Sequence, residues 1–497
     1  MNRIPTLDGV RRELRSRWPE WTALTLFAVV VAVAIPYHEP WGDEAQAWQL
    51  ARNLSLHDLF QTYIRYEATP GLWHFLLWIL CRLHVSYAGM HWICGGIAIA
   101  STSLLILRSP FPRYLKLTLP FTFFLLFQYA VVARGYVLVP LLLFIIADTW
   151  KKHPLVVAVT LGLLANCALH AAVISGGLAM VWLVEQFRAG CLRDSLRRRN
   201  LLFYALIVLA LYAFALWTAW PPSDLAGHIS FDRSLRPSFA VSSLAAILMP
   251  ICQPTILAFP FWIVIVPVFV VRRSLLYLLP VLFFALFSGA VFCVFWHWGL
   301  LVPLLIALLW MTWPSQKTGL APAEIVGRVA ILYMACSQIL WSGYAICFDH
   351  SNAYAPNLAA AQFLMPHVKA GETIAVTYLD ESAGSHSANN IYNATGILPY
   401  FDHSIYINQR DPFYLWSDKN PSESLFHALL PSHPSIVLVE ASKKDADLPI
   451  DLTGEKARLL MNSGYRFTNE FCGSVPFHTQ LMLTNCHMIF QYEGHVP

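Results

Sequence analysis

Long apolar runs separated by short polar segments fill the first 349 residues of the chain. The first run, Leu24 to Pro36, carries no charged residue. Because every backbone polar group in lipid must be hydrogen-bonded internally, a run of about 20 apolar residues predicts a membrane-crossing helix. The pattern predicts a polytopic α-helical membrane protein with about eleven to thirteen transmembrane helices. The further runs lie at 88–107, 117–133, 136–150, 154–168, 171–187, 201–219, 250–271, 274–294, 297–313 and 326–347.

The amino-acid composition is that of an integral membrane protein. Hydrophobic residues make up 57% of the chain, charged residues make up 12%, and the mean hydropathy is +0.53. These values lie outside the usual range of soluble domains. The formal net charge of +4 is small. We therefore expect membrane lipids around the protein and no nucleic-acid partner.

Basic clusters indicate which ends of the apolar runs face the cytoplasm, because Lys and Arg collect in cytoplasmic loops. Residues 1–20 contain five arginines and predict a cytoplasmic N-terminus. The run that follows ends without a small-residue cleavage site, which indicates a retained helix. The first outer loop then covers 38–87. Cytoplasmic turns are predicted at Arg108–Lys116, Lys151–Lys152, Arg188–Arg199, Arg272–Arg273 and Lys317.

The apolar stretch from Gly71 to Leu83 is about half as long as a crossing helix needs to be. If the basic cluster beginning at Arg108 is cytoplasmic, an odd number of crossings joins it to the first outer loop. We therefore expect 71–83 to form a juxtamembrane helix within that loop, and 88–107 to cross. In the alternative topology both stretches cross, and the cluster at Arg108 faces outward.

The chain becomes polar after Cys347. Strand-like runs alternate with helix-like segments there, which predicts an α/β domain over 350–497, joined to a transmembrane domain over 21–349. An odd number of crossings places this domain outside the cytoplasm. The strand-like runs are 372–379, 404–408, 435–441 and 480–486, and the helix-like segments are 356–368, 421–430 and 454–463.

Ten cysteines are scattered along the chain without a CxxC pair. Most of them fall in apolar runs and are interpreted as small core residues, not as metal ligands or a disulfide framework. Only Cys472 and Cys486 lie in a clearly polar region.

The first outer loop contains two adjacent carboxylates, Asp43 and Glu44, in the sequence GDEA. One interpretation is structural, because the following AQAWQLARNL favours a short amphipathic helix whose N-terminus acidic residues stabilise. The other is catalytic, with one carboxylate acting as the general base that takes a proton from an attacking hydroxyl. The two interpretations are compatible.

Arg134 lies between two apolar runs, in AVVARGYVL, where an arginine is costly in lipid and is usually functional or paired. The loop count places it on the same side as Asp43. A guanidinium has the forked geometry that binds phosphate or pyrophosphate, although an arginine that snorkels to lipid headgroups fits the same position. Arg65 and Glu67, in YIRYEATPGLWH, either pair with each other or belong to the same site.

Three histidines and an asparagine complete the set of candidates. Asn166 and His170 are four residues apart and are expected on one helix face. His74 follows the outer loop, and His297 lies between two tryptophans that favour a membrane interface. A lone membrane histidine is more often a packing residue. The distribution of Lys and Arg nevertheless predicts that all the candidates lie near the outer face of the membrane. Acidic and basic side chains together at that face suit the transfer of a group from an anionic leaving group to a hydroxyl.

These motifs resemble those of the GT-C glycosyltransferases, most closely the branch that contains the protein O-mannosyltransferases and the lipid A aminoarabinose transferase. By motif the resemblance covers the first 150 residues, through GDEA, EATPGLWHFLLW and AVVARGYVL, and by architecture it covers the rest. The chain departs from the branch at Thr69-Pro70-Gly71-Leu72, where His-Pro-Pro-Leu is common. It also has no acidic residue soon after Arg134, since the next one is Asp148.

The resemblance implies an inverting glycosyltransferase that moves a sugar from a polyprenyl-phosphate donor to an extracytoplasmic glycan, lipid or protein. Asp43 would be the base with Glu44 supporting it, while Arg134 and Arg65 would hold the carrier phosphate, with His297 as a further phosphate or hydroxyl partner. We expect no metal or other cofactor, and a location in a bacterial inner membrane.

Three other functions remain open. A glycan polymerase or ligase with pyrophosphate-linked donors would depend on arginines and histidines and not on Asp43. A lipid-linked glycan transporter or flippase would keep charges at mid-membrane depth and often shows related halves. A non-catalytic assembly protein is the last alternative.

Overall fold

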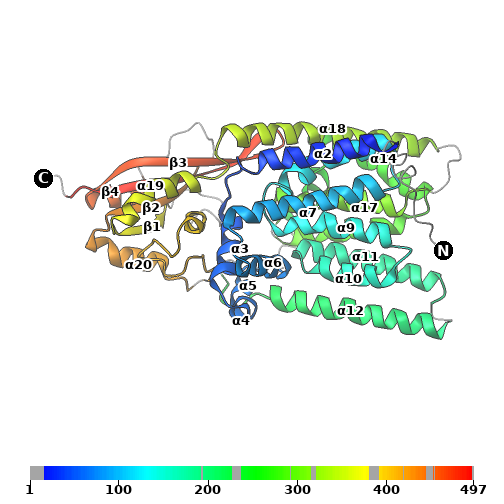
Figure 1. Ribbon diagram of the computed structural model, residues 1–497, viewed down its shortest axis with the longest axis horizontal. Helices are drawn as coiled ribbons and strands as arrows, with labels where there is room; N and C mark the ends of the chain where they lie inside the picture. Colours follow the sequence, from blue (N-terminus) through cyan, green and yellow to red (C-terminus); the bar gives the residue numbers. More distant parts are fainter. Residues whose placement is uncertain are drawn as a thin grey trace, which may run out of the picture.

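The computed structural model describes residues 16–191, 194–225, 237–291, 293–314, 321–379, 391–417, 419–443, 452 and 454–494. A bundle of helices occupies one end of the elongated molecule and a domain with a small sheet occupies the other (Figure 1). A group of short helices lies where the two parts meet (Figure 1): α3 (Gly42–Asn53), α4 (Leu56–Asp58), α5 (Ile64–Tyr66) and α6 (Leu72–Arg82). Most of the arginines of 1–20, the cluster at Lys317 and most of the loop between Trp220 and Pro237 fall outside the described residues.

Four described helices are long and apolar enough to cross a membrane, and eight further apolar helices have 10–17 residues. The expected number of eleven to thirteen crossings therefore stays a prediction. The four long helices are α7 (Tyr87–Arg108), α11 (Leu169–Arg188), α12 (Ser195–Ala219) and α18 (Pro322–Ser351). The others of the bundle are α2 (Trp18–Ala34), α8 (Arg113–Thr118), α9 (Leu138–Thr149), α10 (Pro154–Ala165), α13 (Pro237–Leu248), α14 (Ala258–Val271), α15 (Leu279–Ala290), α16 (Phe295–Trp298) and α17 (Leu301–Met311).

Large apolar side chains cover the outer surface of the bundle. On α12, Leu202, Leu206 and Leu209 are 66%, 65% and 65% exposed. Soluble monomers rarely expose contiguous apolar surface of this kind, and such surface marks contact with a membrane or a partner. The helical part is thus built to face an apolar environment.

One sequence prediction for the bundle was wrong, and one helix was not predicted. The run 117–133 is not one helix: α8 ends at Thr118, and two short pieces follow, η2 (Leu119–Phe121) and η3 (Phe124–Gln128). Pro120 lies in η2, and proline disrupts a helix interior because it has no backbone N–H and its ring crowds the preceding turn. The helix α13 was missed, because its serines interrupt the apolar pattern.

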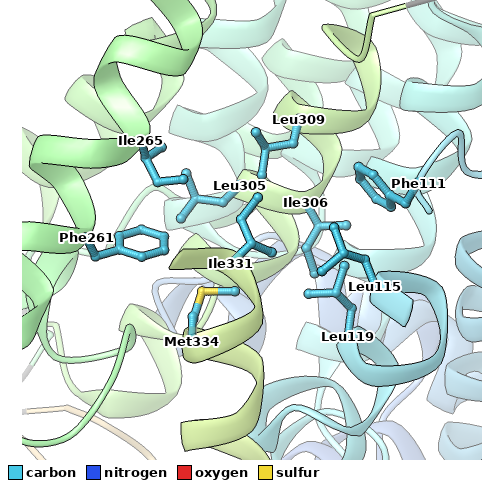
Figure 2. Close-up of a pocket in the computed structure, with 10 residues that line it drawn as sticks. All are labelled: Phe111, Leu115, Leu119, Phe261, Ile265, Leu305, Ile306, Leu309, Ile331 and Met334. Atoms are coloured by element: carbon cyan, nitrogen blue, oxygen red, sulfur yellow. The ribbon is translucent and has the colours of Figure 1, made fainter. Parts of the chain in front are cut away.

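A small apolar void lies inside the bundle. Figure 2 shows ten side chains pointing into it, among them Leu115 of α8, Ile265 of α14, Ile306 of α17 and Met334 of α18. Its volume is about 10 Å³. A space of this size holds at most one water molecule, and an apolar void stays dry. This void belongs to helix packing and not to a ligand site.

The C-terminal domain contains a four-stranded sheet with the order β1-β2-β4-β3. Strand β1 (Ile374–Tyr378) is parallel to β2 (Ile436–Lys443), which is antiparallel to β4 (Gln480–Tyr492), which is antiparallel to β3 (Tyr465–Phe477). Both faces are covered. Val376 and Leu438 pack under α19 (Asn357–Lys369) and η8 (Asn393–Tyr400), while neighbouring residues of the strands pack under α20 (Ser422–Leu429) and α21 (Glu455–Asn462).

The run 404–408 is not a strand of this sheet, since only Tyr406 makes a bridge, to Ile374. Strand β3 was missed, because its arginine, asparagine and glutamate break the apolar pattern. The three helix-like segments became α19, α20 and α21. Cys472 and Cys486, the two cysteines of the polar region, face each other across β3 and β4 and form a disulfide, which the sequence did not predict.

The domain is held to the bundle at its β3–β4 turn. The ring of Phe477 stacks on Phe295 at 4.8 Å between centroids. The His478 ring lies 4.2 Å from Trp341, and its Nε2 lies 3.0 Å from the carbonyl oxygen of Met249. The hairpin therefore reaches between helices that come from the middle and the end of the transmembrane part.

Candidate functional site

Asp43 lies at the junction between the helices and the sheet domain, in the first turn of α3 (Gly42–Asn53). Its Oδ2 accepts from Nη2 of Arg134 at 2.7 Å, and its Oδ1 accepts from the hydroxyl of Tyr392 at 2.7 Å. The side chains of Asp43 and Arg134 are 20% and 19% exposed, so the pair is shielded but reachable. Arg134 of the helical part and Tyr392 of the sheet domain thus both bond the carboxylate of Asp43.

Arg134 lies among aromatic rings. Its guanidinium carbon is 5.6 Å from the ring centroid of Trp41, 4.9 Å from Tyr136 and 5.5 Å from Trp296. Cation–π contacts of this kind stabilise a desolvated guanidinium. Its Nη1 is buried and has no hydrogen-bond partner among the described residues. Nη2 of Arg134 is therefore bonded to Asp43, while Nη1 is available to donate a hydrogen bond to a ligand.

Further nitrogen atoms without partners belong to residues near Arg134. Both ring nitrogens of His74 and Nε1 of Trp73 and of Trp41 are buried without an acceptor among the described residues. A Cβ added to Gly135 would lie only 2.8 Å from Cβ of Trp73, so that ring packs directly against the segment after Arg134. Buried donors are nearly always paired. A cluster of unpaired nitrogens therefore fits a ligand that accepts hydrogen bonds, such as a phosphate.

His74 lies on α6 (Leu72–Arg82), whose eleven residues span about 16 Å, too short to cross a membrane. Burial, and then the positive charge of Arg134, lower the pKa of His74 to about 4. The ring is consequently neutral at physiological pH, with one nitrogen able to donate. The effect of the Arg134 charge on this ring places His74 near Arg134.

Glu44 is a buried connector and does not face the space beside Asp43. Its Oε2 accepts from the backbone N–H of Trp41 at 3.1 Å and lies 3.2 Å from Nε2 of His38. Its Oε1 accepts from the N–H of Ala133 at 2.6 Å and lies 3.0 Å from Nε2 of His91. Although burial alone would raise the pKa of Glu44, His38 and His91 lower it well below the usual range.

His38 continues this network to the last long helix. Its Nδ1 lies 2.9 Å from Oδ2 of Asp349, in the last turn of α18. Burial opposes protonation of His38, but the charges of Asp349 and then Glu44 outweigh it and raise the pKa of His38 to about 10. His38 is therefore a cation between Glu44 and Asp349. Glu44, which follows Asp43 in the chain, and Ala133, which precedes Arg134, are held in place by this network.

Glu67 lies beside the pair and contacts the sheet domain through Gln46. The Gln46 Nε2 donates to Glu67 Oε1 at 2.8 Å and to the carbonyl oxygen of Tyr414 at 2.8 Å, and its Oε1 accepts from the Tyr414 N–H at 2.9 Å. Burial, and also the negative charge of Asp43, raise the pKa of Glu67 to about 7, against the hydrogen bond from Gln46 and the charge of Arg134.

Asn166 and His170 do not share a helix, contrary to the prediction from their spacing. Asn166 ends α10, where its Nδ2 donates to the carbonyl of Gly162 at 2.8 Å, and α11 begins at Leu169. The polar side chain bonds its own last turn and so favours a helix end. Asn166 also accepts from Leu72 N–H through its carbonyl at 3.1 Å, which makes it a link between α10 and α6.

His170 and His297 come together on the far side of Tyr136. Their rings are 4.5 Å apart and nearly parallel, at 23°. The His297 ring meets Tyr136 edge-on at 5.6 Å, and Tyr136 in turn lies under Arg134. Both histidines are therefore neighbours of the Arg134 site.

Arg65 is separate from this group. Its Nε donates to the carbonyl of Trp220 at 3.0 Å on an exposed surface. No contact to Asp43 or Arg134 is found for it in the described parts of the chain, and it does not pair with Glu67. The structure thus leaves Arg65 and Asn166 without a contact to Arg134 in the described residues, whereas the other candidates lie in or next to the Arg134 site.

Several residues of the site were missed from the sequence. Tyr392 and Tyr414 come from the C-terminal domain, in polar loops without a recognisable motif. His38, His91 and Asp349 were read as parts of apolar or loop segments. The one signal was the presence of a histidine or an aspartate at the end of an apolar run, where a charged side chain is usually functional or paired.

This arrangement combines a partly reachable carboxylate, a guanidinium with one unpaired arm and several unpaired nitrogens beside them. It suits proton removal next to a bound anion. A scan against protein-family models, a search of curated proteins and a search of solved structures each found no match to this chain.

Proposed function

We propose that this protein is an inverting glycosyltransferase of the GT-C kind, which moves a sugar from a polyprenyl-phosphate donor to a hydroxyl of an extracytoplasmic acceptor. The observation that carries this proposal is the pairing of Asp43 with Arg134 at 2.7 Å, beside nitrogens that lack an acceptor. A base and an anion site in contact are the two elements that such a transfer requires. The acceptor is a glycan, a lipid or a protein.

Arg134 holds the donor phosphate in this proposal. Its unpaired Nη1, with His74 and the Trp73 indole beside it, offers hydrogen-bond donors to the phosphate oxygens. Rings on several sides of the guanidinium exclude water, and in such surroundings fixed donors stabilise a leaving phosphate far more than they would in water. The lipid tail of the donor extends along the apolar helices.

Asp43 is the general base. The acceptor oxygen attacks the anomeric carbon from the face opposite the phosphate, the bond from carbon to phosphate oxygen breaks, and polyprenyl phosphate leaves with the electron pair. The acceptor proton passes to Asp43. Tyr392 donates to one lone pair of Oδ1, and the acceptor hydroxyl donates to the second lone pair of that oxygen. Glu44 acts as a positioning residue, because all its contacts are made within the protein.

The Cys472–Cys486 disulfide supports an extracytoplasmic location of the sheet domain. Disulfides persist in oxidising compartments and are rare in the cytoplasm. The basic clusters independently predict the same side. Because Tyr392 belongs to this domain and touches Asp43, the active site lies on that side as well.

The test compares Asp43→Asn with Asp58→Asn in protein reconstituted into vesicles. Mass spectrometry of glycolipids and glycans from cells with and without the gene first identifies the missing sugar, and the transfer assay then uses that donor. We expect Asp43→Asn to lower the transfer rate about 10²- to 10⁴-fold, the range of general base catalysis. Asp58, on α4 (Leu56–Asp58), is exposed and bonded to Ser55, so its variant is the matched control.

Full activity of folded Asp43→Asn would refute the base assignment and favour a polymerase or ligase that depends on arginines and histidines. Movement of a lipid-linked glycan across the vesicle membrane without a covalent product would favour a flippase. Each outcome is read from the same reconstituted vesicles.

A further inference from the structure

A second cluster of chemically reactive side chains lies next to Tyr136. The ring of Tyr136 contacts both Arg134 and the His297 ring of this cluster. His170, Cys293 and His297 each offer one ligand atom, and these atoms all lie within 4.8 Å of one another. The residues come from the start of α11, from the segment between α15 and α16, and from α16 itself. None of the assigned roles in glycosyl transfer uses Cys293 or His170.

His170 has a buried ring nitrogen that lacks a hydrogen-bond partner among the described residues. The residue is 4% exposed, and the nitrogen is Nε2. The rings of Phe284 and Phe287 stand at 6.1 Å and 5.1 Å and offer no acceptor or donor. A buried imidazole nitrogen without a partner is costly, and buried polar atoms are nearly always satisfied. A bound metal ion would satisfy it.

His297 has an unprotonated ring nitrogen. The backbone N–H of Val294 donates to its Nδ1 at 3.2 Å, so this nitrogen is the acceptor of the neutral ring. An unprotonated imidazole nitrogen is the form that binds a metal. Coordination through Nδ1 would replace one long hydrogen bond.

Cys293 supplies the third donor. It is a free, partly exposed thiol, four residues before His297, so the two flank the start of α16. A thiolate with two imidazoles is a donor set for zinc or copper, whereas magnesium and calcium prefer oxygen ligands. Three protein ligands leave the fourth position of a tetrahedral zinc site open, as in catalytic zinc sites.

We propose that His170, Cys293 and His297 bind one zinc ion. On binding, the Cys293 thiol loses its proton to solvent, two neutral imidazoles and one thiolate become ligands, and water completes the coordination. No oxidation or reduction takes place. This proposal replaces the expectation of a protein without a metal, which rested on the lack of ligand spacing in the sequence. It does not depend on the proposed glycosyl transfer.

The other groups with metal-ligand atoms in the described residues are less suited. In the cluster of His38, Glu44 and His91, the carboxylate oxygens already bond both imidazoles and two backbone N–H groups. In the cluster at Glu470 the two cysteines are joined in the disulfide. Among the three clusters found in the described residues, the one at His170 alone combines a free thiol with an unpartnered, buried nitrogen.

The experiment uses the full chain in detergent, stripped of metal with a chelator and titrated with Co²⁺ as a spectroscopic substitute for zinc. We expect one equivalent to bind and to produce the near-ultraviolet charge-transfer absorption of a cobalt–thiolate bond. Zinc should then displace the cobalt and abolish the band. Cys293→Ser should lose the band, and the control Cys252→Ser, at a buried free thiol outside the cluster, should keep it.

A second measurement needs no variant. The wild-type protein is treated with N-ethylmaleimide with and without Zn²⁺, and the modified cysteines are mapped by mass spectrometry. Zinc should slow the alkylation of Cys293 at least tenfold and leave the exposed Cys336 and Cys347 unchanged. The proposal is overturned if folded wild-type protein shows no charge-transfer band at saturating Co²⁺, if Cys293→Ser retains the band, or if zinc does not protect Cys293.

Discussion

The hydroxyl of Tyr392 lies 2.7 Å from Oδ1 of Asp43, although 349 positions separate the two residues in the chain. The tyrosine begins the segment that leads into η8, and η8 packs against α3. A Cβ at Gly42 would lie 3.2 Å from side-chain atoms of both Tyr392 and Asn393, so the two segments approach each other closely at this glycine. The sheet domain therefore forms one wall of the site.

Tyr392→Phe should lower the transfer rate about 10- to 100-fold, because a hydrogen bond to a charged group contributes about 1.5–3 kcal/mol. The phenylalanine keeps the ring contacts with Tyr414 and Trp416 and removes only the bond that orients the carboxylate. Steady-state kinetics at saturating donor measure the effect. Tyr63→Phe is the control, since that ring packs on Phe413. An unchanged rate in Tyr392→Phe would show that the tyrosine does not orient the base.

Arg134→Lys should raise the KM for the donor about 10- to 100-fold, because a compact ammonium lacks the rigid, planar fork that directs one arm to Asp43 and the other to a phosphate. The matched variant Arg65→Lys should leave the KM within about twofold, since its side chain bonds the carbonyl of Trp220 and surface substitutions have small effects. Donor titrations of both variants give the comparison. Equal effects of the two substitutions would contradict the assignment of the phosphate to Arg134.

Donor binding should weaken as the pH rises through about 7. Burial raises the pKa of Glu67 to about 7, so this residue is neutral below that pH and an anion above it. The polyprenyl-phosphate sugar is a phosphodiester and keeps one negative charge throughout, which the new carboxylate repels. The KM for the donor, measured on either side of pH 7, should therefore rise with pH. In Glu67→Gln the dependence should be lost, and its persistence there would assign it to another group.

His38→Ala should destabilise the protein strongly. The substitution leaves the buried carboxylates of Glu44 and Asp349 facing each other without the cation between them, and breaking a buried ion pair costs about 3–5 kcal/mol. A fall in the thermal unfolding midpoint of several degrees, measured in detergent, should report it. His57→Ala is the control because that side chain is 78% exposed. Equal midpoints for the two variants would show that the network carries no stability.

The same network predicts how stability depends on pH. The pKa of His38 is raised from an ordinary value of 6.5 to about 10 by Asp349 and Glu44, against the effect of burial. A group with a raised pKa stabilises the folded state fully below its unfolded value, and this stabilisation is lost as the pH rises to the folded value. The midpoint should therefore fall between pH 6.5 and about 10. In His38→Ala this part of the decline should be absent.

The positions of single residues along the apolar pattern predicted much of the helical site. Asp43 was expected on a short amphipathic helix, and Arg134 was expected between two apolar segments on the same side. Both follow from local pattern, because charges are excluded from long apolar runs and collect where the runs end. The distribution of Lys and Arg also predicted that His74 and His297 lie on the same side of the membrane as Asp43.

The partners of these residues could not be predicted. Tyr392 meets Asp43 only because η8 packs on α3, and His38 meets Asp349 only because α2 and α18 are neighbours. Such contacts join distant parts of the chain and leave no periodic pattern. The spacing of Asn166 and His170 misled for a related reason, since a side chain that bonds its own backbone can end a helix inside an apolar run.

The contact between His38 and Asp349 also fixes when the site can form. Asp349 lies in the last turn of α18, which is the last helix before the sheet domain. During synthesis Glu44 is made early, while one of the two anions that keep His38 protonated is made some three hundred residues later. The ion network beside Asp43 is therefore completed only after the final helix has been inserted. A chain truncated within α18 would retain Asp43 and Arg134 and still lack a finished site.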